Sequence, residues 1–490
     1  MSVEPHSLFD SIRVGEDRLA VSMPDGKMTY RQLCQAVKSL LGDLRGEESL
    51  ALWATPELAT IVGLVAALAS GISIIPLNPK SGDRELDHVL KDARVGALLA
   101  ATDATLPAAM TSLRRYSIDP WRSTHGSVTW PTQASGRASK LIMYTSGTTG
   151  PPKGVVLAIS AVRANLEALA RVWHWTDQDH LVHALPLHHV HGLIIGVLGP
   201  VFAGGSVEHL GQFSVDGVIG ALGAGGTMFF GVPTMYHRLA NALDESSELS
   251  RALAGTRLLV SGSGPLMIRD YQRIMQDSGK RVVERYGMTE TLIITSTDLE
   301  SGERPGYVGP ALPSVYVRVI DEMGIDVPAD DETIGTVLVR SPSLFNGYLN
   351  MPKATRSSMI GDWFSTGDLG VLSSDGWLRL VGRISTDLIK SGGYRIGAGE
   401  VEQVLLEHRH VDDVAVKGVP DDDLGERVVA WVVPIAGVDI VPQELIDHVA
   451  ASLAPHKRPR DIVLVTSLPR NDLGKLQKHL LVDGEVGTSS

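Results

Sequence analysis

The sequence predicts an α/β fold, built from mostly parallel sheets covered by helices and followed by a smaller second unit. Between about residues 50 and 310, short apolar runs typical of strands alternate with helical patterns. After Gly306 apolar and polar residues alternate, as in antiparallel strands, and from about Arg383 a new series of helices and strands begins. With 490 residues the chain is too long for a single domain, and two domains are the natural expectation.

The first region contains the runs that we expect to form the parallel strands: residues 50–53, 72–77, 97–100, 140–144, 228–230, 258–261 and 282–284. Residues 58–79 carry no charge and are long enough to span a bilayer. We favour instead a buried helix at 58–69, which ends at Ser70-Gly71 and precedes a strand. The many Ala and Gly residues of this segment give it a weak apolar transfer energy, which supports that choice.

The later regions follow a different pattern. Residues 315–320, 335–340 and 377–381 alternate, and the sequence Ser-Ser-Asp-Gly at 373–376 predicts a hairpin turn, so we expect an antiparallel, barrel-like section. In the second unit, helical patterns cover 399–408 and 442–453, and strand patterns cover 414–419 and 428–434.

The composition excludes several classes of protein. A net charge of −12 argues against a general nucleic-acid binder, because phosphate backbones need clustered cations. A single cysteine, Cys34, excludes a disulfide framework or a cysteine zinc site and suits a reducing compartment. The first residues predict neither a signal peptide nor a transit peptide, so we expect a cytoplasmic protein. We also expect no membrane span and no obligatory protein partner.

The segment from Tyr144 to Gly154 is the most informative part of the chain. It combines several hydroxyl side chains and glycines with Lys153, and it follows the candidate strand at 140–144. Glycines let backbone N–H groups approach an anion, while the hydroxyls and the lysine add donors and a positive charge. The spacing differs from the Walker A pattern, and Pro151-Pro152 block an immediate helix start. We therefore expect a different kind of nucleotide phosphate loop, rather than a flexible linker.

A second cluster, Arg285-Tyr-Gly-Met-Thr-Glu-Thr291, follows the candidate strand at 282–284. Tyr286 could stack on adenine, Thr289 could donate to the α-phosphate, and the Glu290 carboxylate could hold Mg²⁺ together with phosphates. The alternative is a strand-to-helix connection in which Thr289 or Glu290 caps the helix.

These motifs resemble those of the adenylate-forming superfamily, which contains acyl-CoA synthetases, peptide-synthetase adenylation domains and luciferases. Matching stretches extend from near the N-terminus to Lys478. The resemblance implies a large N-terminal domain, here residues 1–383, which binds nucleotide and acid and consists of two mostly parallel sheets and a barrel-like subdomain. It also implies a mobile α+β domain, here residues 384–490, which closes over the ligands in two orientations.

The resemblance assigns roles to individual residues. Asp368 accepts both ribose hydroxyls and Arg383 shares the ribose, while Mg²⁺ is held by Thr149 and Glu290. The remaining ATP-binding positions are Thr145, Ser146, Gly147, Thr148, Thr149, Gly150, Lys153, Ser263, Gly264, Pro265, Arg285, Tyr286, Gly287, Met288 and Thr289.

The C-terminal motifs are assigned in the same way. Lys390 and Gly393 belong to the loop that the mobile domain presents for thioester formation with CoA. Lys475 reaches the acid carboxylate and the α-phosphate during adenylation, so that Lys475, Thr289, Glu290 and Lys153 form the predicted catalytic set. The usual hinge residue is replaced in a segment that is one residue longer, which leaves Ser385 and Thr386 as alternative pivots.

The acid-binding residues are predicted from a third group of segments. The sequence Leu-Pro-Leu-His-His-Val-His-Gly at 185–192 resembles the acyl-pocket segment of the superfamily and contributes His189; a zinc site is the alternative for its three histidines. Arg238 would suit a dicarboxylate better than a fatty acid. Ser261 and Met288 complete the predicted acid pocket.

Longer stretches near residues 53–56, 76–83, 230–238 and 453–460 are similar to bacterial malonyl-CoA synthetases. The resemblance implies that malonate, with methylmalonate as a second acid, reacts with ATP to give an acyl-AMP and pyrophosphate, after which CoA displaces AMP. The alternatives are a ligase for another short acid such as acetate or propionate, an amino-acid adenylation domain, and a non-catalytic nucleotide-binding relative.

Overall fold

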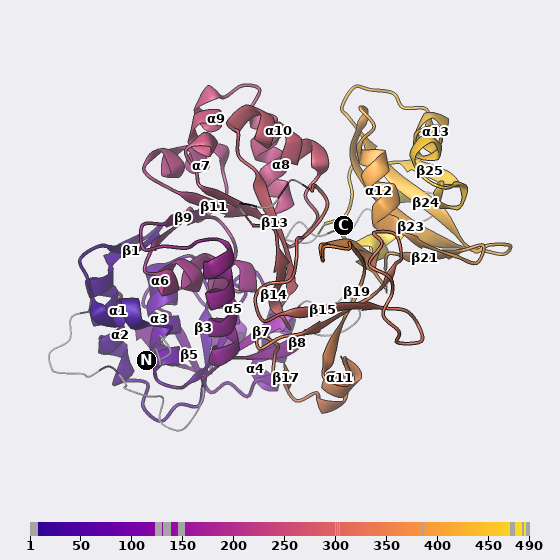
Figure 1. The fold of residues 1–490 in the computed structure, drawn as a ribbon. Helices are drawn as coiled ribbons and strands as arrows, with labels where there is room; N and C mark the ends of the chain where they lie inside the picture. The colour runs from indigo at the N-terminus through magenta and orange to yellow at the C-terminus, as the bar shows by residue number, and fades with distance from the viewer. Residues whose placement is uncertain are drawn as a thin grey trace.

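The computed structural model describes residues 8–122, 130, 139–145, 152–298, 300, 302, 304–384, 386–470, 476–482 and 485–486. It contains two mostly parallel, helix-covered sheets, a barrel-like antiparallel sheet and a smaller C-terminal unit, which confirms the predicted fold class (Figure 1). Arginine, glutamate and other charged residues are rare in the core, which is almost entirely aliphatic and aromatic.

The first sheet has the strand order β17-β8-β7-β4-β3-β5-β6. Its parallel part confirms the strands expected at 50–53, 72–77, 97–100 and 140–144, and the strand pairs of β8 with β7 and β17 are antiparallel. The strands are β3 Ser49–Trp53, β4 Ser73–Leu77, β5 Ala97–Ala101, β6 Arg114–Ile118, β7 Lys140–Thr145, β8 Lys153–Ala158 and β17 Gly347–Tyr348; the associated helices are α2 Tyr30–Leu41, α3 Leu58–Ala69 and α4 Asp83–Asp92.

Helix α3 occupies the uncharged segment that had two interpretations. All of its residues are buried, as expected for a helix that is apolar on every side and packed inside a large protein. Gly63 allows this packing, because a Cβ there would lie 2.7 Å from the Ile118 side chain. Throughout the part of the chain that the structure describes, no helix combines the length and the apolar character needed to cross a membrane.

The second sheet has the order β14-β13-β12-β11-β9-β10-β1-β2 and is parallel except at its two ends. Its strands are β1 Leu19–Met23, β2 Gly26–Thr29, β9 His180–His183, β10 Ser206–His209, β11 Met228–Gly231, β12 Leu258–Ser261, β13 Val282–Met288 and β14 Leu292–Ser296. Its helices are α1 Asp10–Val14, α5 Ile159–Val172, the π-helix η2 His191–Leu198, α6 Gly199–Ala203, α7 Val215–Gly223, α8 Pro233–Ala242, α9 Ser247–Ala254 and α10 Ile268–Ser278.

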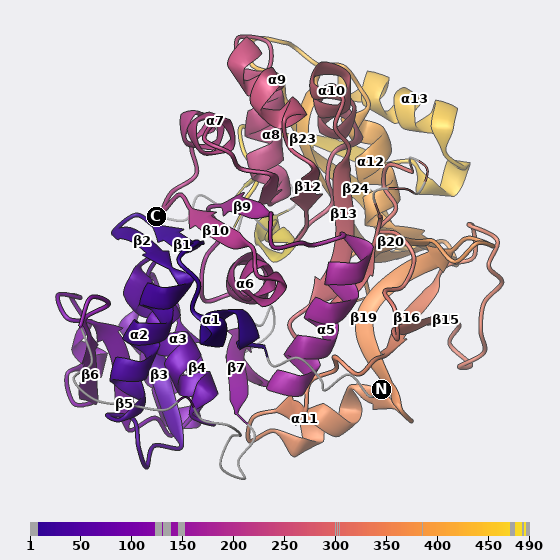
Figure 2. The ribbon, with the colours of Figure 1, turned by 60° about the vertical axis from the view of Figure 1, so that its left-hand side comes forward.

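The two sheets share one large apolar core. This cluster of buried side chains includes Leu141 of β7, Leu166 of α5 and Leu181 of β9. Helix α5 packs against both β8 and β14, and Figure 2 shows it along the edge where the two sheets meet the barrel-like section. The central strands of both sheets are therefore held by one common core.

The barrel-like sheet confirms the antiparallel section that alternation predicted. It consists of β15 Tyr316–Ile320, β16 Gly335–Arg340, β18 Met359–Ile360, β19 Trp363–Leu372 and β20 Leu378–Arg383, with the short helix α11 Pro352–Ser357 beside it. The predicted turn at 373–376 joins β19 to β20, and Gly376 adopts the positive φ of 83° that the turn requires.

The C-terminal unit has its own sheet and its own core. The elements are β21 Leu388–Ser391, β22 Tyr394–Gly397, α12 Ala398–Leu406, β23 Val411–Asp421, β24 Gly425–Pro434, α13 Pro442–Ser452 and β25 Asp461–Leu464, followed by β26 Leu481–Val482 and β27 Glu485–Val486. Its main core cluster includes Ile389, Val416 and Val449. Figure 1 places this unit beside α8 and α10; the domain boundary at residue 383 stays a prediction.

Candidate active site

The glycine-rich segment connects two antiparallel strands. Strand β7 ends at Thr145, β8 begins at Lys153, and these two residues are paired across the hairpin. The predicted positions Ser146, Gly147, Thr148, Thr149 and Gly150 lie outside the described residues. The structure therefore places the two ends of the segment, at a sheet's edge beside Tyr348 and Gly154, and not its interior.

Lys153 and Glu290 meet through a residue that the sequence did not single out. The Tyr348 hydroxyl donates to Glu290 Oε1 at 2.8 Å, and Lys153 Nζ lies 5.3 Å from the centre of the Tyr348 ring. The Glu290 side chain is buried, and its backbone carbonyl accepts from Phe345 N at 2.8 Å. A Gly-Tyr pair after an apolar run was the available signal for Tyr348, but no spacing rule links it to Glu290.

The Arg285–Thr291 segment forms a strand and a tight return, so the strand-to-helix alternative is wrong. Strand β13 continues to Met288, and β14 runs back beside it from Leu292. A Cβ at Gly287 would lie 2.0 Å from Leu292 O, so only glycine permits this close return. Thr289 is half-buried at the tip of the hairpin.

Tyr286, Asp368 and Arg383 come together from β13, β19 and β20. The Tyr286 hydroxyl donates to Asp368 Oδ2 at 2.5 Å, and Arg383 Nε lies 2.9 Å from Asp368 Oδ1. Burial, followed by the nearby Asp368 charge, raises the pKa of Tyr286 well above its usual value, so its hydroxyl stays a donor. A carboxylate with two oxygens can accept further hydrogen bonds beside these partners.

Arg285 is buried against Gly262. The ideal Cβ position of Gly262 is 2.3 Å from the Arg285 guanidinium carbon, so the guanidinium fills the space that a side chain would need. Nε and Nη2 of Arg285 have no hydrogen-bond partner within the described ranges. Burial lowers the pKa of Arg285 to about 10, which leaves the group charged at neutral pH.

Two buried histidines belong to the surroundings of Arg285. Both ring nitrogens of His191 and Nε2 of His183 are unpartnered among the residues that the structure places. Burial, together with Arg285 for His191 and His209 for His183, holds the pKa of each imidazole well below its usual value. The site thus combines one buried cation with neutral donors and acceptors, an arrangement suited to a single anionic group.

The other predicted acid-site residues lie at different places. Ser261 is in register with Glu284, so strand alternation directs it to the opposite face from Arg285. Arg238 is exposed on α8. Met288 is half-buried at the end of β13.

His188 and His189 form a pair of rings tilted by 51°, with centres 4.2 Å apart. Burial lowers the pKa of His189 to about 4; burial, His189 and Lys80 lower that of His188 to about 3. Within the described ranges, no three His, Cys, Asp or Glu side chains are arranged to hold a metal ion, so the zinc alternative has no support there.

The loop Ser263-Gly264-Pro265 follows β12 and contacts the start of α8. Ser263 has a positive φ of 72°, and a Cβ on Gly264 would lie 3.6 Å from the Pro233 ring. This position at the carboxyl end of a parallel strand is where open α/β sheets bind ligands.

The thioester-loop residues lie on a hairpin of the C-terminal unit. Gly392 and Gly393 join β21 to β22 with φ values of 56° and 81°, as a two-residue hairpin turn requires. Lys390 and Gly393 are exposed. Lys475 lies outside the described residues, so the structure does not place it relative to this hairpin.

The segment after Arg383 is a tight turn. Asp387 Oδ2 accepts from Arg383 N at 2.9 Å, and Asp387 N donates to Arg383 O at 2.8 Å. Thr386 is exposed within this turn, while Ser385 lies outside the described residues. Asp387 is a functional candidate that the sequence motifs did not indicate, because the expected hinge position is Ser385 or Thr386.

Comparisons with known proteins identify the chain's relatives. The family described as AMP-binding enzyme matches residues 8–349, and the AMP-binding enzyme C-terminal domain matches 400–475. The mitochondrial malonate–CoA ligase ACSF3 of Homo sapiens is 34% identical over 95% of this chain and 90% of its own length. A malonate–CoA ligase of Arabidopsis thaliana is 34% identical over 89% of this chain and 78% of its own.

Solved structures agree with this chain along nearly its whole length. ATP-bound MatB from Rhodopseudomonas palustris is 32% identical, with a TM-score of 0.87 over 96% of this chain and 97% of its own. A malonyl-CoA ligase in a ternary product complex with methylmalonyl-CoA and AMP is 48% identical, with a TM-score of 0.73 over 94% of this chain and 100% of its own.

Proposed function

The chain belongs to the family of AMP-binding enzymes, and within that family we propose that it is an ATP-dependent malonate–CoA ligase. The reaction joins malonate to CoA through malonyl-AMP and releases pyrophosphate and AMP. Malonate–CoA ligases among the relatives at about 34% identity support the acid, and the product complex with methylmalonyl-CoA supports methylmalonate as a second substrate.

The buried guanidinium of Arg285 is the observation that carries the choice of acid. A charged group without a partner is costly to bury, and the cost is offset when an anion binds there. We assign to Arg285 the second carboxylate of malonate, the one that does not react. A monocarboxylic acid such as propionate would leave the guanidinium unpaired, so the site discriminates against it.

Ser261, Met288, His189 and Arg238 keep their predicted roles as further acid-site residues. Their neutral or exposed character gives them a smaller share of the charge recognition. Because Arg238 is exposed on α8, water screens its interaction with a carboxylate more strongly than that of Arg285.

The nucleotide is assigned to the carboxyl ends of the two sheets. Asp368 accepts hydrogen bonds from the ribose hydroxyls, and Arg383 donates to the ribose. The Tyr286 ring stacks on adenine beside the loop of Ser263, Gly264 and Pro265. The hydroxyls and N–H groups from Thr145 to Gly150, with Lys153 and Thr289, bind the phosphates.

The residues of this region suit Mg²⁺ as a cofactor. Glu290 offers a buried carboxylate beside the phosphate-binding residues, and Thr149 offers a hydroxyl; Mg²⁺ takes few protein ligands when phosphates supply the rest. When bound, the ion neutralises phosphate charge. Tyr348, which donates to Glu290, orients that carboxylate.

The first chemical step is an attack of one malonate oxygen on the α-phosphorus, which breaks the bond to pyrophosphate. Two anions must approach, so cationic groups lower the barrier; we assign this role to Lys475, with Thr289 donating to the α-phosphate. In the second step the CoA thiolate attacks the acyl carbon and AMP leaves. The exposed hairpin with Lys390 and Gly393 is assigned to CoA.

The cytoplasm and the lack of an obligatory protein partner stay predictions. Fractionation of the producing cells and the mass of the purified protein in solution test them.

Malonate-dependent ATP–pyrophosphate exchange tests the proposed function. The wild type should exchange with malonate and methylmalonate, and much less with acetate, propionate or butyrate. Arg285→Met should reduce kcat/KM for malonate at least roughly a hundredfold, because the second carboxylate of malonate would lose its ion pair and be buried without a partner. Arg238→Ala should have a smaller effect.

Preferential exchange with propionate or butyrate by the wild type would contradict malonate as the substrate. A complete absence of exchange with every acid would favour the non-catalytic alternative.

A further inference from the structure

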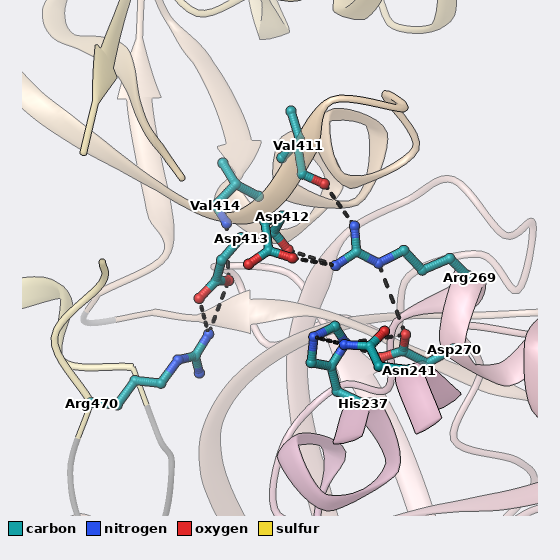
Figure 3. A network of polar contacts seen from close by, with 9 residues as sticks. All are labelled: His237, Asn241, Arg269, Asp270, Val411, Asp412, Asp413, Val414 and Arg470. Carbon is teal, nitrogen blue, oxygen red and sulfur yellow. Dashed lines mark hydrogen bonds and ion pairs between the residues drawn. The ribbon is translucent and has the colours of Figure 1, made fainter. Parts of the chain in front are cut away.

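An arginine of α10 binds the first residues of β23 in the C-terminal unit. Arg269 Nη1 donates to Val411 O at 2.6 Å, and Nη2 donates to Asp412 O at 2.7 Å (Figure 3). Pairing of β23 with β24 is irregular between Val411 and Asp413, so Asp412 is passed over in the ladder. The guanidinium fork thus holds two consecutive carbonyls at a bulge.

Arg269 is itself oriented from the N-terminal side. Its Nε lies 3.9 Å from Oδ1 of Asp270, whose side chain is almost completely buried. His237 of α8 binds the same carboxylate through Nδ1 at 3.1 Å, and its Nε2 is 3.0 Å from Asn241 Nδ2. Figure 3 shows these side chains as one continuous network behind the guanidinium.

The residue after the bulge is connected to the segment that precedes Lys475. Both Asp413 carboxylate oxygens accept from Arg470 Nη2, at 3.0 and 2.7 Å. Arg470 forms an isolated antiparallel bridge with Leu476, and Gln477 N donates to Pro469 O at 2.8 Å. Arg470 and Leu476, the described residues on either side of positions 471–475, are therefore held beside β23.

Polar contacts contribute much of what fixes the C-terminal unit relative to the N-terminal sheets. The two apolar clusters of the C-terminal sheet contain, within the described residues, no side chain that precedes Ile389. Among the described residues, one small apolar cluster crosses the boundary, in which Leu388 of β21 packs against Leu369, Val371 and Val381 of the barrel-like sheet. Units that share so little apolar core move relative to one another unless specific contacts fix them. Two charge-assisted hydrogen bonds from one side chain are among the stronger such contacts.

We propose that Arg269 is a positioning residue for adenylate formation. By holding the β23 bulge it fixes, through Asp413, the position of Arg470 relative to the nucleotide-binding sheets, and Arg470 precedes Lys475 in the chain. The proposal rests on the role assigned to Lys475 in the proposed function. Arg269 itself touches neither substrate nor reacting atoms.

The test compares Arg269→Ala with Arg273→Ala in the full-length protein. Arg273 lies one turn further along α10 and pairs with Asp277 and Asp244, all on the N-terminal side, so it controls for the loss of a partly exposed arginine. Arg269→Ala should lower the rate of ATP–pyrophosphate exchange roughly tenfold or more, given two lost charge-assisted hydrogen bonds. Arg269→Lys should be intermediate, because an ammonium lacks the fork.

The second half-reaction is measured separately, as CoA released from malonyl-CoA and AMP. It should stay within about twofold of the wild type in every variant, since adenylate formation is the affected step. Equal losses in both half-reactions, or an exchange rate in Arg269→Ala equal to that of Arg273→Ala, would overturn the proposal.

Hydrogen exchange of the peptide around residues 407–416 gives a readout that needs no substrate. These amides should exchange faster in Arg269→Ala and not in Arg273→Ala. Unchanged protection would overturn the proposed role of Arg269 in holding the β23 bulge, even if malonate proves to be the wrong acid. If protection falls as expected but no acid supports ATP–pyrophosphate exchange in the wild type, the hold of Arg269 on the β23 bulge stands and the proposed function fails. If another acid is the substrate, ATP–pyrophosphate exchange is compared with that acid.

Discussion

At the residue scale, the position of Arg285 depends on the absence of a side chain at residue 262. The guanidinium lies where the Cβ of any other residue would stand, 2.3 Å from the Arg285 Cζ and Nε atoms. The neighbouring strands β12 and β13 are in register at Ser261 and Glu284, so Gly262 cannot move away without disturbing the sheet. A methyl group there must displace the charged group.

Gly262→Ala should therefore impair recognition of the second carboxylate. We expect a KM for malonate increased at least roughly tenfold, with a smaller change for propionate, because only the dicarboxylate uses the cation. ATP–pyrophosphate exchange with each acid measures this difference. Gly220→Ala is the matched control, since a Cβ on this exposed residue of α7 meets nothing within 4 Å; an equal effect of both variants would argue against the assignment.

At the scale of elements, β9, β10 and the π-helix η2 bring neutral histidines into the core. Gly196 of η2 packs on the His183 ring, where its Cβ would lie 3.0 Å from Nε2. His209 Nε2 donates to Leu185 O at 2.9 Å, and its Nδ1 accepts from Gly211 N at 2.9 Å. Wide helical turns of this kind often occur at functional sites.

This group of elements should lose stability in mild acid. Burial depresses the pKa of five histidines in these elements and the loop between β9 and η2: His183, His188, His189, His191 and His209. Their contribution is complete above the unfolded value of 6.5, because neither state then binds a proton, and it falls as the pH drops because only the unfolded state gains protons.

Because the pKa values of His188 and His189 lie near 3 and 4, each of these two costs about 1.4 kcal/mol over the pH unit below 6.5, and together they predict a loss of roughly 3 kcal/mol between pH 7.5 and 5.5. The lowered pKa values of His183, His191 and His209 add to this loss. Urea unfolding at pH 7.5 and pH 5.5 measures this loss of unfolding free energy, with hydrogen exchange of N-terminal peptides as the probe. His183→Asn should reduce the loss by about one histidine's share. Equal or greater stability at pH 5.5 would contradict the depressed values.

How far these elements could be predicted depended on how regular their patterns are. The apolar runs of β3, β11 and β12 and the helix α3 were located correctly because burial on all sides leaves an unbroken apolar signature. The π-helix was missed, since residues 191–198 are equally compatible with an α-helix or a buried strand. Strand β14 was missed because its pairing with β13 depends on the close backbone approach at Gly287, and the pattern of apolar residues does not indicate such an approach.

The site was predictable where one residue carries the chemistry, and less so where partners are remote. Tyr286, Asp368 and Arg383 were chosen separately, and the structure brings them together from three strands. Tyr348 and Arg269 were not found, because their roles come from contacts with residues 58 and more than 140 positions away. The sequence motif indicated that Arg285 binds the nucleotide, and only its burial in the structure suggests that it binds the acid.

At the scale of the whole molecule, the turn after Arg383 is joined to the end of the chain by a buried ion cluster. Lys478 Nζ lies 2.6 Å from both Asp387 Oδ1 and Glu402 Oε1, and its side chain is 11% exposed. Burial opposes the charge of Lys478, but the two carboxylates outweigh it and raise its pKa. One lysine thus connects the inter-unit turn, α12 and the segment after Lys475.

Removing this lysine should destabilise the C-terminal unit and leave the N-terminal sheets unchanged. Lys478→Met leaves two largely buried carboxylates, 18% and 19% exposed, without their cation, and the loss of such a partner typically costs about 3 kcal/mol. Hydrogen exchange of β24 in denaturant should report this loss, while β3 keeps its protection. Arg427→Met is the control, because its pair with the exposed Asp461 is worth about 1 kcal/mol or less. Equal losses in β24 and β3 would mean that the two units unfold as one, and unchanged protection of β24 would show that the cluster adds nothing to stability.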